Sequence, residues 1–344
     1  MVRVLHVIPE DGLGGAELAA RRTAERLGDR FTLVSLTGGP EGARPSNVVY
    51  LGGRGPLDLG AAWRAARMAR DHEVALFSLW KAMPALILSR FLAPRARRVL
   101  FLHSDRRVHL ADAWLSWLGA WFADEIWADS ESSISGFAGL ARRDTPRRVI
   151  SFVMHRPQGR RRTEPSWRFI FWGRLNILKR LDRIVGLFAA IATRRPEARL
   201  TLVGPDAGTE ASTRRQVAEL GLDDRVRFTG PLSFDEICAE ADRHDVFFQL
   251  SDQEGAAMAL VEAMQLGLAC VVTPVGEMGR YVRHMESGVI YESEAQAALD
   301  IERMLENPEL FARISAQAID LWDGRRLYED DVIAAAQALA AREV

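Results

Sequence analysis

Two cations, Arg174 and Lys179, follow a predicted buried strand at residues 169–172 and lie five positions apart. Ligands of parallel sheets bind beyond the carboxyl ends of the strands, so both side chains could face a diphosphate leaving group without a metal ion. Lysine is rare in this chain, because only Lys81 and Lys179 occur among 45 basic residues. This rarity favours a functional Lys179 over the alternative, a solvated basic loop.

Two carboxylates, Glu254 and Glu262, lie eight positions apart where a predicted strand, 245–250, leads into a predicted helix, 257–266. The spacing is about two helical turns and places both near one helix face. A carboxylate accepts hydrogen bonds from vicinal hydroxyls, so the pair could hold the sugar and the ribose of a nucleotide-sugar. The N–H groups at residues 256–258 could hold the phosphates between them. A chance pair of glutamates is the alternative interpretation.

The first strand, 2–8, is joined to the first helix by a loop that includes Gly12, Gly14 and Gly15. Such a loop lets backbone N–H groups approach a phosphate, although tight-turn sterics explain it equally well. The dinucleotide pattern G-x-G-x-x-G would require glycine where Glu17 stands, and the predicted second strand, 31–37, does not end in an acid. A nicotinamide dehydrogenase is therefore disfavoured.

His103 ends the predicted strand 98–103 and could face a cleft between two domains, with a purely structural role as the alternative. The aromatic residues that follow have helical spacing and are expected in the core, and contact with a membrane surface is the second interpretation. These aromatic residues are Trp114, Trp117, Trp121, Phe122 and Trp127. The arginines that favour the membrane interpretation are Arg95, Arg97, Arg98, Arg106 and Arg107.

Short apolar runs alternate with segments of helical period along the whole chain, which predicts parallel sheets covered by helices. A proline-punctuated polar stretch interrupts this alternation once. We therefore expect an α/β protein with a first domain at 1–158, a linker at 159–166, a second domain at 167–322 and a C-terminal helix within 323–344. In the first domain the expected strands are 2–8, 31–37, 47–51, 73–79, 98–103, 125–129 and 149–153.

Composition excludes several classes of protein. The 344 residues carry a formal net charge of -1, and no nucleic-acid motif is present, which argues against a DNA-binding role. No apolar run approaches the roughly 18 residues of a membrane span, and two cysteines with a short apolar N-terminus predict the cytosol. Residues 1–165 hold 25 Lys and Arg against 17 Asp and Glu, which suits an anionic ligand or membrane face. No Asp-x-Asp pair offers a handle for Mg²⁺ or Mn²⁺, and the P-loop is absent.

The Gly14-Gly15 loop, Gly173-Arg174 with Lys179, and the pair Glu254 and Glu262 together resemble the retaining glycosyltransferases of family 4. The resemblance spans nearly the whole chain. It implies the GT-B architecture, two Rossmann-like domains with parallel sheets facing a central cleft, with the last helix crossing back onto the first domain. It also implies metal-independent transfer of a sugar, with retention of configuration, from a UDP- or GDP-linked donor to a saccharide or lipid-linked acceptor, with no separate cofactor.

The same resemblance implies roles for single residues. Arg174 and Lys179 would stabilise the departing diphosphate, Glu254 and Glu262 would bind the donor sugar and the ribose, and His103 would lie near the attacking hydroxyl. The implied catalytic residues are His103, Arg174, Lys179 and Glu254. The implied donor-binding residues are Gly14, Gly15, Arg174, Lys179, Leu232, Glu254, Gly255, Ala256, Ala257, Met258 and Glu262.

The chain departs from the family where Ala256-Ala257 replaces the usual Phe-Gly, and where Glu277 replaces a glycine after Gly276. The first change suggests an altered donor-sugar pocket. Assembly of a polysaccharide, lipopolysaccharide, glycolipid or natural product is the expected setting, in the cytoplasm and with peripheral contact to the inner membrane face as an option. A nucleotide-sugar epimerase and a non-catalytic nucleotide-sugar binding protein are the alternatives.

Overall fold

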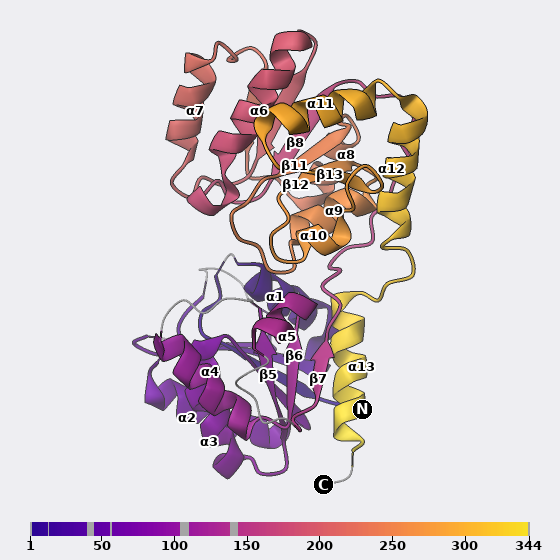
Figure 1. Ribbon diagram of the computed structural model, residues 1–344. Helices are drawn as coiled ribbons and strands as arrows, with labels where there is room; N and C mark the ends of the chain where they lie inside the picture. The colour runs from indigo at the N-terminus through magenta and orange to yellow at the C-terminus, as the bar shows by residue number, and fades with distance from the viewer. Residues whose placement is uncertain are drawn as a thin grey trace. The chain divides into compact units, whose positions relative to one another are not determined.

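The computed structural model describes residues 2–12, 14–39, 45–55, 57–103, 110–137 and 144–342. The chain divides into two compact units, and it passes from one to the other twice. Unit 1 comprises Met1–Met154 and Arg326–Val344, and unit 2 comprises His155–Arg325. Each unit is a parallel sheet flanked by helices (Figure 1). The α/β class predicted from the alternation of elements is confirmed.

The sheet of unit 1 has the order β3-β2-β1-β4-β5-β6-β7, and all its strands are parallel. In the centre, Val4 of β1 lies opposite Phe31 of β2 on one side and Val74 of β4 on the other. The strands are β1 (Val4–Ile8), β2 (Phe31–Ser35), β3 (Val48–Tyr50), β4 (Val74–Ser78), β5 (Arg97–Leu102), β6 (Glu125–Ala128) and β7 (Arg147–Val149). The central strands are buried on both faces, as parallel strands are when helices cover them.

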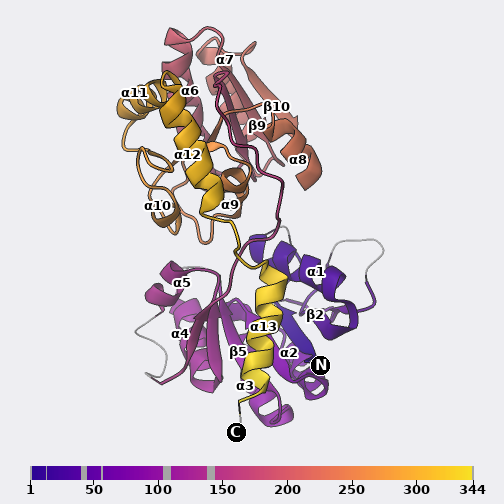
Figure 2. The same ribbon diagram turned by 90° about the vertical axis from the view of Figure 1, so that its right-hand side faces the viewer.

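Helices cover both faces of this sheet (Figure 2). One face packs against α2 (Leu59–Met68), α3 (Met83–Leu92) and α4 (Leu110–Phe122), largely through alanines. The other carries α1 (Gly15–Leu27) and α13 (Tyr328–Ala340), which contact each other, and α5 (Glu131–Gly136) follows β6. The sequence predicts the first helix from Gly15 or Ala16 to Leu27, and the structure confirms both ends, with Gly28 adopting a positive φ of 54° just beyond it.

The sheet of unit 2 has the order β10-β9-β8-β11-β12-β13 and is also parallel throughout. Its strands are β8 (Arg168–Trp172), β9 (Arg199–Val203), β10 (Val226–Gly230), β11 (Val246–Gln249), β12 (Ala269–Val272) and β13 (Gly288–Ile290). Its helices are α6 (Leu181–Arg194), α7 (Glu210–Glu219), α8 (Phe234–Ala241), α9 (Met258–Gln265), α10 (Met278–Tyr281), α11 (Glu294–Leu305) and α12 (Pro308–Asp320). Buried phenylalanines and leucines of β8, β9, β11 and α6 form one core.

In both sheets the order in which strands are added reverses at the first strand, and we call this position the direction reversal of the unit. β1 lies between β2 and β4, and β8 lies between β9 and β11, so successive connections leave on opposite sides. Such a reversal opens a crevice beyond the carboxyl ends of the strands, where ligands of open α/β sheets bind. The segments after β8 and after β11 therefore meet, although they are far apart in sequence.

Two predicted boundaries need correction. The strand expected at 149–153 ends at Val149, because the chain then leaves the sheet. Beyond it, the Ser151 N–H donates to the Asp331 carboxylate at 2.8 Å. The Val153 carbonyl accepts from the Tyr328 N–H at 2.9 Å. The segment 159–166 is irregular, as expected of a linker, but it packs on unit 2. Arg162 is buried and donates to the Ala241 carbonyl at 2.9 Å.

The expectation of an aromatic core on α4 is correct only in part. Trp127, on β6, is fully buried, but Trp114, Trp117 and Trp121 are 59%, 39% and 53% exposed. The helix packs inward through small residues instead. Helical spacing alone was compatible with either orientation, and the neighbouring helices decided between them.

Two glycines form a close contact at the carboxyl ends of β8 and β9. The Gly173 N–H donates to the Val203 carbonyl at 3.0 Å, and a Cβ on Gly204, whose φ is +141°, would lie 1.8 Å from the Gly173 carbonyl oxygen. The backbone that carries Arg174 is therefore positioned by a contact that only glycine permits.

We expect Gly204→Ala to lower the free energy of unfolding by about 3 kcal/mol, because both the positive φ and the overlap with Gly173 oppose a side chain. Gly221→Ala is the matched control: it also has a positive φ, +65°, but no atom lies within 4 Å of the added Cβ, and it should cost about 1 kcal/mol. Urea denaturation of both variants measures the difference. Equal losses would contradict the proposed contact.

Candidate functional site

Lys179 and Glu254 form an ion pair at the direction reversal of unit 2. Lys179 ends a short helical turn, Ile177–Lys179, that Asn176 caps by accepting hydrogen bonds from the N–H groups of Leu178 and Lys179. Its Nζ lies 2.5 Å from Glu254 Oε1, and the two side chains are only 19% and 10% exposed. The structure thus brings together two predicted site residues that lie 75 positions apart in the sequence.

Two further donors hold the same carboxylate oxygen. Gln249 Nε2 lies 2.7 Å and Ser251 Oγ 2.6 Å from Glu254 Oε1. Three hydrogen bonds to one oxygen stabilise the charged carboxylate and hold it in one orientation. Sequence reasoning missed Gln249 and Ser251. Their signal was available, since both are polar residues at the end of a strongly apolar strand.

Glu262, on α9, is held by an aromatic side chain. The Trp172 indole N–H donates to Glu262 Oε2 at 3.0 Å, and Trp172 itself is 4% exposed at the end of β8. On the other side, His155 Nε2 lies 4.0 Å from Glu262 Oε1, and the His155 ring stacks on Phe234 with 3.5 Å between ring centroids. Trp172, His155 and Phe234 were not predicted as site residues, because no pattern along the chain links them to Glu262.

The start of α9 is strained at the position where the chain departs from the family pattern. Ala257 precedes the helix with φ 51° and ψ 55°, a left-handed conformation that costs a residue with a Cβ about 1–2 kcal/mol. Ala256 and Ala257 are buried, and Met258 is the first helical residue. The Gly255 carbonyl accepts a hydrogen bond from the N–H of Glu277. The loop that contains Glu277, the second departure from the family pattern, therefore packs directly on this turn.

Arg174 and Leu232, the other predicted residues of unit 2, lie in loops. The Arg174 side chain is exposed directly after Gly173, and Leu232 is half-buried between β10 and α8. Their roles therefore stay predictions.

In unit 1, His103 belongs to a chain of buried polar groups. Its Nδ1 lies 3.3 Å from Asp129 Oδ2, and its Nε2 lies 2.9 Å from Ser78 Oγ, which also lies 2.7 Å from His6 Nε2. A carboxylate only accepts, so His103 Nδ1 carries a proton and donates to Asp129, while the Ser78 hydroxyl links the Nε2 atoms of His103 and His6. The His103 side chain is 5% exposed, and it could contact a substrate only after releasing one of these partners.

His6, at the end of this chain of groups, is neutral. Burial, together with the neighbouring His103, lowers the pKa of His6 from 6.5 to about 3. Among the described residues no group hydrogen-bonds to its buried Nδ1, so a proton added to this nitrogen would have no acceptor.

A cavity of about 260 Å³ lies at the carboxyl ends of β1, β4 and β5 in unit 1, the direction reversal of that sheet. His103, Lys81, Trp80, Glu10 and Glu17 contribute to its lining. Leu79, at its edge, has φ 64° and ψ 152°, a region that residues other than glycine rarely adopt. The predicted Gly14 and Gly15 lie at the start of α1, one turn before Glu17.

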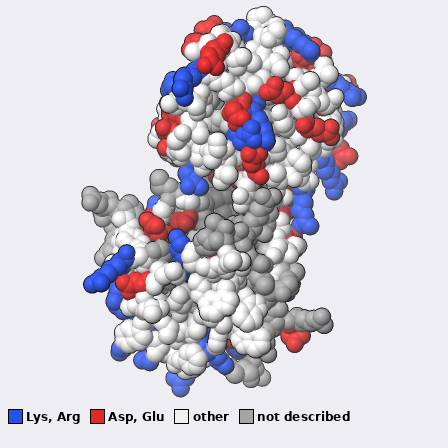
Figure 3. Space-filling view, turned by 60° about the vertical axis from the view of Figure 1, so that its left-hand side comes forward, with Lys and Arg blue, Asp and Glu red and all other residues white. Residues whose placement is uncertain are grey.

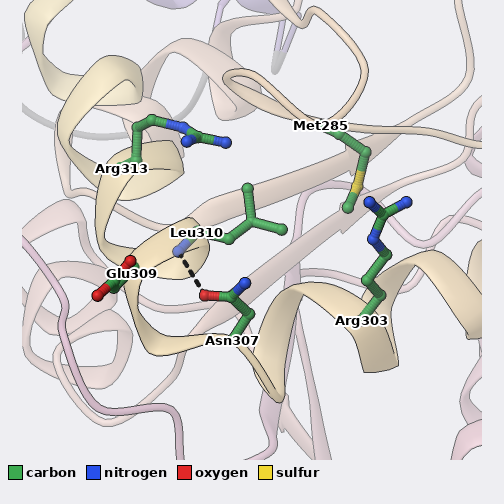
Figure 4. Close-up of a pocket in the computed structure, with 6 residues that line it drawn as sticks. All are labelled: Met285, Arg303, Asn307, Glu309, Leu310 and Arg313. Carbon is green, nitrogen blue, oxygen red and sulfur yellow. Dashed lines mark hydrogen bonds between the residues drawn. The ribbon is translucent and has the colours of Figure 1, made fainter.

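A second cavity, of about 230 Å³, lies in unit 2 beside α11 and α12 and contains none of the predicted site residues (Figure 4). Its polar residue Asn307 caps α12, because its side-chain oxygen accepts from the Leu310 N–H at 3.0 Å. The position of Asn307 in this cavity is therefore explained by its role as the N-cap of α12.

The described residues can be searched for metal-binding clusters and for reactive thiols. No cluster of three or more His, Cys, Asp or Glu side chains among these residues is arranged to bind a metal ion. Burial raises the pKa of Cys238 to about 11 and also raises that of Cys270, so both thiols are protonated at neutral pH. Of the helices described, none has both the length and the apolar character needed to cross a membrane.

Comparison with known proteins relates unit 2 to a known family. Residues 156–320, most of unit 2, match the family described as glycosyl transferases group 1. A GDP-mannose:cellobiosyl-diphosphopolyprenol alpha-mannosyltransferase of Xanthomonas campestris is 33% identical over 138 residues, 40% of this chain and 36% of that protein. The N-acetyl-alpha-D-glucosaminyl L-malate synthase of Bacillus anthracis is 28% identical over 257 residues, 69% of this chain and 66% of that protein. The chain thus matches between about a third and two thirds of the length of these relatives.

Solved structures match over nearly the whole chain. HepE of Anabaena, in complex with UDP, superposes with a TM-score of 0.81 at 21% identity, covering 99% of this chain and 100% of HepE. A sucrose-phosphate synthase of Thermosynechococcus elongatus gives a TM-score of 0.76 at 15% identity, with 98% of each chain covered. These likenesses concern the fold. They confirm two Rossmann-like domains of the GT-B class.

The neutral state of His6 predicts a pH dependence of stability. Because its pKa is lower in the folded than in the unfolded chain, its contribution is fully present above pH 6.5 and is lost as the pH falls toward 3. Between pH 7 and pH 5 this loss amounts to roughly 2 kcal/mol. In urea denaturation, the free energy of unfolding of His6→Gln, whose amide can still donate to Ser78, should fall by roughly 2 kcal/mol less than that of the wild type between pH 7 and pH 5. His284→Gln, at an exposed position, should show the same fall as the wild type. Identical slopes for wild type and His6→Gln would refute the assignment.

Proposed function

We propose that this protein is a glycosyltransferase that takes a sugar from a UDP- or GDP-linked donor and transfers it to a hydroxyl of a saccharide or lipid-linked acceptor. The observation that carries the proposal is the Lys179–Glu254 pair, with Glu262 on the helix that follows, at the direction reversal of unit 2. The same segment matches glycosyl transferases group 1. Relatives whose names specify GDP-mannose and a neighbour crystallised with UDP support a nucleotide-sugar as donor.

In this proposal, the donor spans the residues gathered after β8 and β11. The Lys179 ammonium group has three N–H donors, and at least one of them donates to the diphosphate in place of Glu254. Arg174 supplies a second cation. Glu254 accepts hydrogen bonds from the sugar hydroxyls, while Glu262, already oriented by Trp172, accepts from the ribose diol. The N–H groups from Gly255 to Met258 bind phosphate oxygens at the start of α9, and the backbone at Leu232 meets the base.

The transfer step needs neither a metal ion nor a protein nucleophile in this scheme. The bond between the anomeric carbon and the phosphate oxygen breaks, the acceptor oxygen bonds to the same face of that carbon, and the acceptor proton passes to the leaving phosphate oxygen. Configuration is thereby retained. Arg174, Lys179 and the α9 N–H groups stabilise the charge that develops on the diphosphate. His103 contacts the sugar or the attacking hydroxyl once Ser78 releases its Nε2, and Gly14 and Gly15 lie along the donor.

The division of labour follows the two units. Unit 2 holds the donor, and unit 1 binds the acceptor. Unit 1 holds 23 Lys and Arg against 20 Asp and Glu, and this small positive excess is compatible with an anionic or lipid-linked acceptor in cytoplasmic assembly of a polysaccharide or glycolipid.

Nucleotide binding tests the proposal first. We expect one of UDP, GDP or ADP, added at about 100 times its dissociation constant, to stabilise the full-length protein by about 3 kcal/mol in thermal unfolding. The matching nucleotide-sugar should then yield the glycosylated acceptor in EDTA-containing buffer, with the donor's anomeric configuration seen by NMR. Stabilisation without any product would favour a binding protein, and turnover of the donor without acceptor would favour an epimerase. No stabilisation by any nucleotide contradicts the proposal.

The ion pair gives a second prediction. Lys179→Ala and Glu254→Ala should each reduce kcat by at least about 100-fold, because each removes a group aimed at the transition state. Arg180→Gln is the matched control, since Arg180 neighbours Lys179 but pairs with Asp182 and Asp252, and it should stay within a few-fold of wild type. Steady-state kinetics at saturating donor, with thermal unfolding to verify folding, measure the effect. Activity near wild type in either alanine variant would remove the mechanism.

A further inference from the structure

Helix α4 of unit 1 packs with its small side inward. Its buried residues are Asp112, Ser116, Gly119 and Ala120. A Cβ on Gly119 would lie 2.2 Å from the sulfur of Met83, so the Met83 side chain of α3 packs directly on the backbone of α4 at this position. Leu115 and Phe122 also pack against the core, whereas the three tryptophans of α4 point away from the protein.

These tryptophans and two neighbours form a continuous apolar surface, which we name the tryptophan face. It consists of Phe91 on α3 and Leu110, Trp114, Trp117 and Trp121 on α4, with exposures of 70%, 89%, 59%, 39% and 53%. The α4 members recur at intervals of four and three residues and so lie in one stripe, about 16 Å long. The rings of Trp117 and Trp121 lie 6.3 Å apart, as do those of Phe91 and Phe122. An exposed apolar surface of this kind is typical of an interaction site.

The exposed charged residues on the helices of this side of unit 1 are arginines. Within α2, α3 and α4, the exposed charged residues are Arg64, Arg67 and Arg90, and the only acid, Asp112, is buried. Arg95, just beyond α3, is also exposed. The space-filling view of this side of unit 1 shows a broad uncharged area with Lys and Arg along its lower edge (Figure 3).

Not every arginine that the sequence associated with a membrane belongs to this surface. Arg98 is buried and paired with Asp124, and Arg97 donates to the carbonyl of Arg342. Arg106 and Arg107 lie outside the described residues. The basic rim is therefore formed by Arg95, which the sequence singled out, and by Arg64, Arg67 and Arg90, which it did not.

We propose that the tryptophan face docks on the surface of an anionic lipid bilayer, with α4 lying in the plane of the interface. Tryptophan rings favour the boundary between headgroups and acyl chains, and arginines beside them can reach lipid phosphates while their stems stay in apolar surroundings. The 13 residues of α4 are too few to cross a bilayer, so the helix lies on it. This docking does not depend on the proposed glycosyl transfer.

The shape of the surface favours a bilayer over a protein partner. The tryptophan face has five apolar residues, four of them in a stripe one helix, about 10 Å, wide, whereas a stable protein interface takes roughly 20–30 residues from each partner. A bilayer requires no such complementary area, because apolar burial and attraction to anionic headgroups act along a narrow helix.

Flotation of the full-length protein with vesicles tests this proposal. We expect the wild type to float with vesicles of phosphatidylglycerol and phosphatidylcholine, and to float less with phosphatidylcholine alone or at high salt. Trp114→Ala with Trp121→Ala should reduce the bound fraction at least 10-fold, and Arg90→Glu should reduce binding to the anionic vesicles only. These positions are exposed, so the variants should keep the wild-type Tm.

Leu220→Ala is the matched control, because it removes an apolar side chain that is 46% exposed in unit 2, and it should leave flotation unchanged. Failure of the wild type to float with anionic vesicles overturns the proposal, as does equal flotation of the double tryptophan variant. A concentration-dependent dimer that the double variant abolishes, in a protein that does not float, would overturn it in favour of self-association.

Discussion

The parallel order of the strands, with its reversal at the first strand of each sheet, is the constraint on which the rest of the molecule depends. In unit 2 the reversal places the loop after β8 beside the loop after β11. Lys179 therefore meets Glu254, and Trp172 meets Glu262, although 75 and 90 positions separate the partners. The contact of Gly173 with Gly204, which leaves no space for a Cβ, and the hydrogen bond from the Gly173 N–H to the Val203 carbonyl position the backbone directly before Arg174.

The charged groups at this position are held before any ligand arrives. Glu254 receives three hydrogen bonds on one oxygen, and Glu262 is fixed by an indole that is itself buried. Holding polar groups in place costs folding free energy, which the large cores of the sheets supply, and it reduces the reorganisation needed when a substrate binds. The strained Ala257 at the start of α9 fits this pattern, since strain in the backbone is tolerated where surrounding contacts determine the conformation.

Unit 1 uses the same reversal for a different set of groups. Its polar chain from Asp129 through His103 and Ser78 to His6 is almost fully buried, and it leaves His103 with both nitrogens engaged. On the outside of the unit the usual arrangement is inverted. Mostly small residues of α4 face the protein and tryptophans face outward, and at Gly119 the Met83 side chain of α3 packs directly on the helix backbone.

The sequence by itself determined the α/β class and most strands and helices, and it predicted the charged residues of the candidate site, since periodicity, strand-end position and residue type are local properties. It singled out Lys179 from its rarity and Glu254 with Glu262 from their spacing. Only the tertiary structure decided which groups meet: Trp172 with Glu262, Gln249 and Ser251 with Glu254, and His6 with Ser78. It also decided that α4 turns its tryptophans outward, which helical spacing leaves open. The physical reason is that pairing across a sheet, and the face that a helix buries, depend on neighbours supplied by distant parts of the chain, about which a local pattern carries no information.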